Sequence, residues 1–335
     1  MINNILAVSV GGLGDTILFS PVLKALRAKY VSAEIHLLAA SCLTKEAYGQ
    51  CQEIDNITVL HVMGRKKFWQ ALEFFRFALS YRKNIGCSIG VFATGLNSKL
   101  IRMLKLVSGI KNVYIAPSPP HYPTDFLCNL SLASIFCKDI SEKDVFFPSS
   151  PEAFREAKAA LLSYGISIEF DRYLVIYPST DLPHRPRFML EKLADSCQEI
   201  KERGFKGKII VVGSASEGRE WDRADTHNAA DANLAGKISV SAVGDILRNA
   251  SLAIGNDGGI MHVAGAVGCP VVAIMPNTPV SYRPAGRKTK IVKSNYQCCL
   301  DVYPNRPNSC TKAKCAEDIK VRDIVKLSLE LLPII

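Results

Sequence analysis

Short apolar runs alternate with longer amphipathic stretches along the first half of the chain. The apolar runs predict strands over residues 5–10, 35–39, 57–62 and 88–93. Apolar residues at helical spacing predict helices from just after Gly14 to Tyr30, over 68–81 and over 99–107. Strands that alternate with helices in this way predict an α/β fold with a mostly parallel, doubly wound sheet.

The second half repeats this alternation. Ser149-Ser150-Pro151-Glu152 carries a serine cap and an early proline, so it predicts a helix that runs to about Tyr164. The strands predicted next cover 173–177, 208–212, 252–254 and 271–275, and the helices cover 190–203, 241–249 and a segment after Gly259. We therefore predict two domains, residues 1–165 and 166–335, the second with a C-terminal helix. Ligands of such sheets bind at the carboxyl ends of the strands.

The composition agrees with two buried α/β cores. The 335 residues are about twice a typical domain, and 48% of them are apolar against 21% charged, which argues against disorder. No apolar run approaches the roughly 18–20 residues that span a bilayer. The N-terminus lacks the basic start and long apolar stretch of a signal peptide. We expect a cytoplasmic protein.

The net charge of +10 is concentrated in one part of the sequence. Between His61 and Ile115 there are ten Lys and Arg residues, and Glu73 is the acidic residue that opposes them. Lys99, Arg102 and Lys105 share one face of a predicted helix. This charge favours nucleic acid, a phospholipid surface or a phosphorylated substrate. Because aromatic residues accompany the charge and no nucleic-acid motif does, we expect an anionic membrane surface and no nucleic acid.

Two glycine-rich turns are candidate binding sites. Val10–Thr16 joins a predicted strand to a helix, but Ile17 stands where a dinucleotide fingerprint needs its third glycine. Asp15 in this turn is either a helix cap or a general base at a helix N-terminus. Leu252–His262 has the same strand, turn and helix order, and its backbone N–H groups could hold a pyrophosphate. A tight turn with a capping Asp257 and a packed His262 is the structural alternative.

A third candidate follows the strand predicted over 173–177. The loop Pro178–Pro186 carries hydroxyls and bases suited to phosphate, although ordinary loops have the same composition.

Together the three segments resemble the ADP-heptose:lipopolysaccharide heptosyltransferases of glycosyltransferase family 9, over nearly the whole chain. Gly11-Gly12-Leu13-Gly14-Asp15 resembles the family's opening S-x-x-G-D turn. The segment Gly255–His262 is similar to the family's most specific motif, G-N-D-[ST]-G-P-M-H. Pro178-Ser179-Thr180 aligns with the phosphate-contacting P-G-A or A-T-T turn.

The resemblance implies a GT-B fold, in which two Rossmann-like, doubly wound domains face a central cleft. It also implies inverting transfer without a metal or cofactor, from ADP-heptose to the lipid-anchored lipopolysaccharide inner core. Asp15 would be the general base that deprotonates the acceptor. The implied donor contacts are Ser179 and Thr180 with the diphosphate, Asp257 beside Asn256 with the sugar, and Gly258, Gly259 and His262 with the phosphates.

The first domain is the expected acceptor domain. Its candidate acceptor-binding residues are Gly12, Gly14, Lys99 and Arg102. Because the lipopolysaccharide inner core is phosphorylated and lipid-anchored, the basic region leads us to expect a peripheral protein at the inner face of the cytoplasmic membrane.

The chain departs from the family pattern at the donor site. Pro183-His184-Arg185-Pro186 lacks the family's Lys and Trp, so His184 or Arg185 would take the cationic role. Gly258 replaces the usual Ser or Thr and removes a hydroxyl, and Ile260 replaces Pro. These departures leave open a family member with another nucleotide sugar, an epimerase on this fold, and a sugar-nucleotide or dinucleotide binding protein without transfer activity.

Eleven cysteines are present, and most stand singly in apolar surroundings, as reduced thiols do in a cytoplasmic protein. Cys298, Cys299, Cys310 and Cys315 cluster near the C-terminus. Only the spacing of Cys310 and Cys315 comes near that of a zinc site, so we expect loop thiols there, with a structural metal or disulfide as the alternative.

Overall fold

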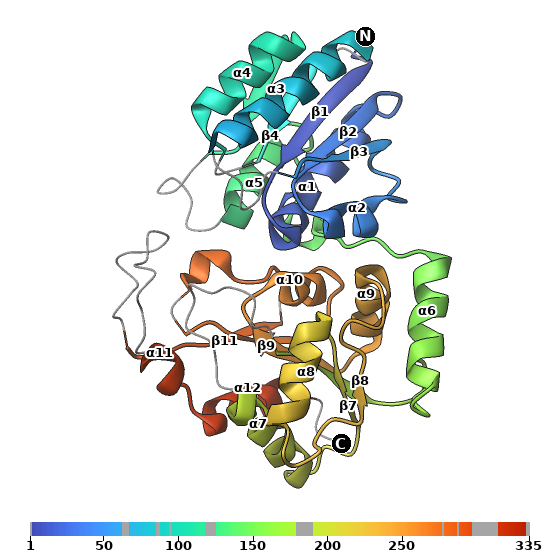
Figure 1. The fold of residues 1–335 in the computed structure, drawn as a ribbon, viewed down its shortest axis with the longest axis vertical. Coiled ribbons are helices and arrows are strands. Elements are labelled where there is room, and N and C mark those ends of the chain that lie inside the picture. Colours follow the sequence, from blue (N-terminus) through green and yellow to red (C-terminus); the bar gives the residue numbers. More distant parts are fainter. Residues whose placement is uncertain are drawn as a thin grey trace. The chain divides into compact units, whose positions relative to one another are not determined.

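A computed structural model of the chain describes residues 2–61, 67–84, 88–93, 96–117, 125–178, 190–276, 278–286, 288–296 and 314–332. The chain divides into two units, Met1–Pro148 and Ser149–Ile335. Each unit is built around one parallel sheet (Figure 1).

The first unit contains a five-stranded sheet in the order β3-β2-β1-β4-β5. The strands are β1 Asn4–Ser9, β2 Glu34–Ala39, β3 Asn56–Val59, β4 Ile89–Phe92 and β5 Asn112–Ile115, all paired in parallel. The helices are α1 Leu13–Lys29, α2 Cys42–Tyr48, α3 Lys67–Asn84, α4 Ser98–Ser108 and α5 Asp125–Ser134, with the short turn η1 Glu142–Asp144.

Both faces of this sheet are covered. Helices α3 and α4 lie side by side (Figure 1) over a core that includes Leu6, Val8 and Phe92. Ile5 and Ala7 alternate with Leu6 and Val8 along β1 and are also fully buried, so they face the opposite side. Because α1 contacts β1 and packs on α5, these two helices cover that side. The predicted doubly wound arrangement is confirmed for this unit.

The second unit contains a six-stranded parallel sheet in the order β11-β10-β9-β6-β7-β8. The strands are β6 Tyr173–Tyr177, β7 Lys208–Val211, β8 Ala232–Asn233, β9 Leu252–Asn256, β10 Val271–Ile274 and β11 Thr289–Val292. The helices are α6 Pro151–Leu162, α7 Leu190–Glu202, α8 Ala215–Ala224, α9 Val240–Asn249, α10 Gly259–Ala266, α11 Lys314–Glu317 and α12 Val321–Leu331, with the short turn η2 Val280–Tyr282. Two α/β units with parallel sheets confirm the predicted fold class.

The boundary between the units lies earlier than the predicted one after residue 165. Helix α6 belongs to the second unit because it packs on α9. The Glu156 carboxylate accepts hydrogen bonds from the Ser239 N–H, at 2.8 Å, and from the Ser239 hydroxyl. The Ser149 hydroxyl donates to Asp245 at 2.7 Å, which fixes the first residue of the unit. The sequence predicted where α6 begins but not that it packs on α9.

Several short elements were not predicted, among them α2, β5, α5, α8 and β11. Helix α8 shows why: its buried residues Glu217, Gly218, Trp221 and Ala224 follow helical spacing, but only Trp221 and Ala224 are apolar, so the sequence shows no apolar stripe there. Among the helices that the structure describes, none is long and apolar enough to cross a membrane.

Candidate functional site

The first glycine turn joins β1 to α1 in the first unit. Gly12 caps the helix, and its N–H donates a hydrogen bond of 2.6 Å to Oδ2 of Asp15 in the first helical turn. A Cβ atom at Gly11 would stand 2.2 Å from that oxygen, so the close approach of the carboxylate requires glycine there. Asp15 therefore does cap α1, as the structural alternative proposed. Its side chain is also exposed, which leaves it accessible to a substrate.

A second carboxylate, not predicted from the sequence, lies near Asp15. Asp125 is the first residue of α5, the helix that packs on α1. Burial raises the pKa of Asp125, and the negative charge of Asp15 raises it further. The available signal was an acidic residue after a proline-rich stretch, where helices commonly start.

The remaining acceptor candidates are divided between two helices. Gly12 is the N-cap of α1, and Gly14 lies in the first turn of that helix. Lys99 and Arg102 are exposed on α4, whose first turn is capped by the Asn97 side chain at 2.8 Å from the Lys99 N–H. No hydrogen bond or ion pair among the described residues joins Lys99 or Arg102 to the glycine turn.

The second glycine turn lies at the carboxyl ends of three neighbouring strands, β6, β9 and β10. The Asn256 side chain donates to the carbonyl oxygen of Pro178, just after β6, at 3.1 Å. The Asp257 N–H donates to the carbonyl oxygen of Ile274 at 3.1 Å. These bonds fix the turn to the strands on both sides of β9.

Asp257 is also held through its side chain. The Thr278 hydroxyl donates to its carboxylate at 2.9 Å, and Thr278 is itself 2% exposed. Thr278 was not predicted from the sequence, although a hydroxyl just past a strand end was a usable signal. The bond fixes the orientation of the Asp257 carboxylate.

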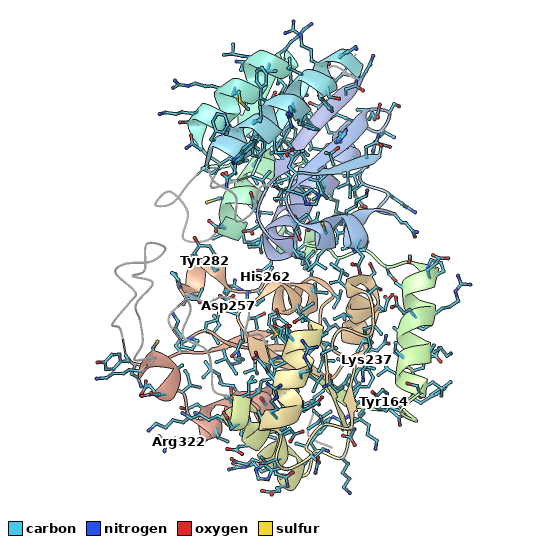
Figure 2. All side chains as sticks on the ribbon, in the orientation of Figure 1. Tyr164, Lys237, Asp257, His262, Tyr282 and Arg322 are labelled. Carbon is cyan, nitrogen blue, oxygen red and sulfur yellow. The ribbon has the colours of Figure 1, made fainter. Side chains whose placement is uncertain are left out.

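Helix α10 begins at this turn. Gly258 is its N-cap and Gly259 its first residue, while the His262 side chain is buried in the first turn. Figure 2 shows Asp257 and His262 beside α10. Backbone N–H groups at a helix start, a fixed carboxylate and an imidazole form a set that can bind a phosphate and a sugar hydroxyl together.

Other predicted residues lie outside the described ranges. These are Ser179, Thr180, His184, Arg185, Cys298, Cys299 and Cys310. Cys315 is described and is buried in α11. Within the described ranges, no group of three or more His, Cys, Asp or Glu side chains could hold a metal ion.

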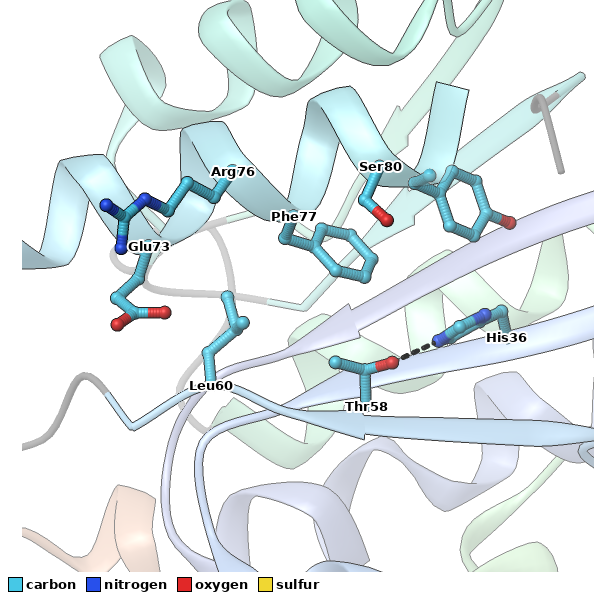
Figure 3. Close-up of a pocket in the computed structure, with 8 residues that line it drawn as sticks. His36, Thr58, Leu60, Glu73, Arg76, Phe77 and Ser80 are labelled. Atoms are coloured by element: carbon cyan, nitrogen blue, oxygen red, sulfur yellow. Dashed lines mark hydrogen bonds between the residues drawn. The ribbon is translucent and has the colours of Figure 1, made fainter. Parts of the chain in front are cut away.

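The first unit also contains a pocket of about 340 Å³ between β3 and α3 (Figure 3). His36 lines it, with Nε2 at 2.7 Å from the Thr58 hydroxyl, and is stacked edge-on against Phe77 and Tyr81. Burial lowers the pKa of His36 to about 4, so the imidazole is neutral at pH 7. The pocket lies on the α3 face of the sheet, whereas Asp15 belongs to the α1 face.

Comparison with known proteins places the second turn in a family context. The pattern of Glycosyltransferase family 9 (heptosyltransferase) matches residues 142–312, about half of the chain. The lipooligosaccharide heptosyltransferase 2 of Haemophilus influenzae is 36% identical over 62 residues, a match that spans only 18% of this chain and 18% of that protein.

Two solved structures share the fold along the whole chain. The glycosyl transferase family 9 protein of Veillonella parvula has a TM-score of 0.76 at 16% identity, covering 98% of this chain and 97% of that one. The ADP-heptose lps heptosyltransferase II of E. coli has a TM-score of 0.71 at 17% identity, with 98% of both chains covered. The family pattern covers β6, β9 and the turn that starts α10. The chain belongs to glycosyltransferase family 9.

Proposed function

We propose that this protein transfers a heptose from ADP-heptose to the inner core of lipopolysaccharide, with inversion at the anomeric carbon and without a metal. The observation that carries the proposal is the turn Asn256–His262, where Thr278 fixes the Asp257 carboxylate beside the start of α10. This arrangement suits a ligand that has both a diphosphate and sugar hydroxyls. Family membership supplies the reaction class.

At the donor, the N–H groups at the start of α10 and the His262 side chain bind the diphosphate. They offset the negative charge that grows on the ADP leaving group as its bond to the anomeric carbon breaks. The Asp257 carboxylate accepts hydrogen bonds from the sugar and fixes its orientation. Ser179 and Thr180, with His184 or Arg185, complete the proposed set of donor contacts.

At the acceptor, Asp15 is the general base. Its carboxylate takes the proton from the attacking hydroxyl while the new C–O bond forms on the face opposite the departing diphosphate. The Gly12 N–H and the N-terminus of α1 stabilise the negative charge of Asp15 and fix its position. Gly12 and Gly14 let the acceptor approach this carboxylate closely.

We also propose that helices α3 and α4 bind the anionic inner face of the cytoplasmic membrane, where the acceptor is anchored. The side chains of Phe68, Trp69 and Leu106 are 71%, 53% and 76% exposed. The exposed cations Lys99 and Arg102 lie on α4, the helix that packs on α3. Apolar rings that enter the interface next to cations that pair with phospholipid headgroups are typical of peripheral membrane binding.

Asp15→Asn tests the proposed base. Asparagine still accepts the Gly12 hydrogen bond but cannot take a proton, so we expect transfer from ADP-heptose to fall at least about 100-fold. The Kd for ADP should stay unchanged. Asp144→Asn is a matched control because Asp144 accepts the Ser141 N–H in the same i, i+3 geometry, at 2.8 Å, and lies outside the proposed site. Transfer by Asp15→Asn at the parent rate would show that Asp15 is not the general base. A much higher Kd for ADP would instead indicate that Asp15 contacts the donor.

A screen of nucleotide sugars separates the alternatives. Thermal unfolding of the parent protein with ADP-, UDP-, GDP- and dTDP-sugars should show stabilisation by the ADP-sugar first. Stabilisation by another nucleotide sugar alone would indicate a family member with a different donor, as the glycine at position 258 could permit. Binding without transfer to any acceptor would favour a binding protein.

A further inference from the structure

Tyr177 and Gly258 lie side by side at the second glycine turn, which joins β9 to α10. Tyr177 is the last residue of β6, and Gly258 is the N-cap of α10. A Cβ atom at Gly258 would stand 2.7 Å from Cε1 of Tyr177 and 2.9 Å from its phenolic oxygen. Both distances are shorter than the non-bonded contacts that a Cβ atom makes in proteins. A side chain at position 258 and the Tyr177 ring therefore cannot occupy their present positions together.

The backbone at Gly258 does not itself require glycine. Its φ of 177° and ψ of 174° describe an extended conformation that any residue adopts. The Tyr177 ring is therefore the feature that excludes a side chain there. The Ser or Thr that the family usually carries at this position would have to displace the phenol.

The backbone that carries the ring is fixed by strand pairing. Tyr177 is 9% exposed and pairs in register with Gly255 on β9. A Cβ atom at Gly255 would stand 2.5 Å from the carbonyl oxygen of Tyr177. Gly255 thus lets the two strands approach closely, and Gly258 leaves room for the ring that this approach brings to the helix start.

We propose that the Tyr177 hydroxyl contacts the diphosphate of the nucleotide-sugar donor, in place of the Ser or Thr hydroxyl that Gly258 lacks. This inference rests on the proposed function. The phenolic oxygen lies beside the N-cap of α10, where backbone N–H groups attract an anion. A phenol donates one hydrogen bond, as a serine does, and a bond to a charged phosphate oxygen is among the stronger ones. The donor site keeps its hydroxyl but takes it from β6 instead of α10.

The hydroxyl is tested by removing one oxygen atom. Isothermal titration with ADP and with ADP-heptose should show Tyr177→Phe binding both about tenfold more weakly than the parent. Tyr173→Phe is the matched control, since Tyr173 lies on the same strand and its hydroxyl donates to the carbonyl oxygen of Ile246 at 3.0 Å. That control should lose stability and keep the parent's Kd. Equal Kd values for the parent and Tyr177→Phe overturn the inference.

The exclusion of side chains is tested without any nucleotide. Gly258→Ser should lower the midpoint of thermal unfolding, and adding Tyr177→Ala should recover most of that loss because the ring no longer blocks the serine. The double variant should also bind ADP more tightly than Tyr177→Ala alone, since serine restores a hydroxyl. Unchanged stability of Gly258→Ser would overturn the steric argument.

The two proposals fail in distinguishable ways. A parent protein that binds none of the ADP-, UDP-, GDP- or dTDP-sugars overturns the proposed function, and the ligand role of Tyr177 with it. If the parent and Tyr177→Phe bind ADP-heptose equally tightly, only the role of the Tyr177 hydroxyl is overturned, and the proposed function stands.

Discussion

The carboxylates of Asp15 in the first unit and Asp257 in the second are fixed by different kinds of partner. Asp15 accepts a backbone N–H from Gly12, which stays in place when a side chain is changed to anything but proline, whereas Asp257 accepts the side-chain hydroxyl of Thr278. The hydrogen bond to Asp257 can therefore be removed by a side-chain substitution that leaves the backbone unchanged.

Thr278→Val removes the hydroxyl and keeps the shape of the side chain. We expect the Kd for ADP-heptose to rise about tenfold, because Asp257 loses a charge-assisted hydrogen bond and its fixed orientation. The Kd for ADP alone should change less, since Asp257 is assigned to the sugar. Thr278→Ser, which keeps the hydroxyl, serves as the control in the same titrations. Equal effects on ADP and ADP-heptose would contradict the assignment of Asp257 to the sugar.

His36 gives the first unit a pH-dependent stability. With a pKa of about 4 in the folded state and about 6.5 unfolded, it binds a proton only in the unfolded chain between those values. The folded state should therefore lose up to about 3 kcal/mol as the pH falls from 6.5 to 4, and nothing above 6.5.

His36→Gln removes this titration and is the comparison that isolates it. Urea unfolding of both proteins at pH 7.5 and pH 5 should show the parent losing more free energy of unfolding than the variant. Equal losses would mean that His36 is protonated in the folded protein. The Thr58 bond at 2.7 Å, which a glutamine can replace, limits the other effects of the substitution.

At the scale of elements, the strands and turns that bear the motifs were predictable and the helices beside them were not. The strands now seen as β1, β6 and β9 are apolar runs bounded by glycine or proline, so their positions followed from the sequence. Helix α5 carries Asp125 next to Asp15, but which helix packs on α1 depends on the strand order, and an apolar period does not encode that order. The same limit hid Thr278, which meets Asp257 only because β10 pairs with β9.

The proposed membrane binding by α3 and α4 can be tested through the cations of α4. Reversing the charge of Lys99, Arg102 and Lys105 to Glu should greatly reduce cosedimentation with phosphatidylglycerol vesicles at 0.1 M salt, because headgroup attraction becomes repulsion. The matched control reverses three exposed cations of the second unit, Lys206, Arg219 and Arg223, and so changes the net charge equally. Equal loss in both variants would show that only the total charge matters.

At the scale of the whole molecule, the two units have separate cores, and α6 decides where the second begins. Three of its side chains, Ala153, Ala157 and Leu161, are buried. If the second unit begins at Ser149, α6 should stabilise it. If it began after residue 165, as the sequence predicted, α6 should contribute nothing to its stability.

A fragment of residues 149–335 should unfold at a higher temperature than one of residues 166–335. Loss of α6 removes at least about 3 kcal/mol of apolar burial and the Glu156–Ser239 bonds, which corresponds to a difference of about 6–12 °C. Circular dichroism of both fragments during heating measures it. Equal midpoints would show that α6 contributes nothing to the second unit.

The Tyr177 ring fills the space next to Gly258, so during evolution the glycine at position 258 should have arisen before the tyrosine at position 177. In an ancestor with serine or threonine at position 258, a tyrosine at position 177 would have met a side chain, whereas the glycine could be accepted first. Related sequences should therefore show a one-way dependence. Tyrosine at the position of Tyr177 should occur only with glycine at the position of Gly258, while that glycine should also occur beside smaller residues.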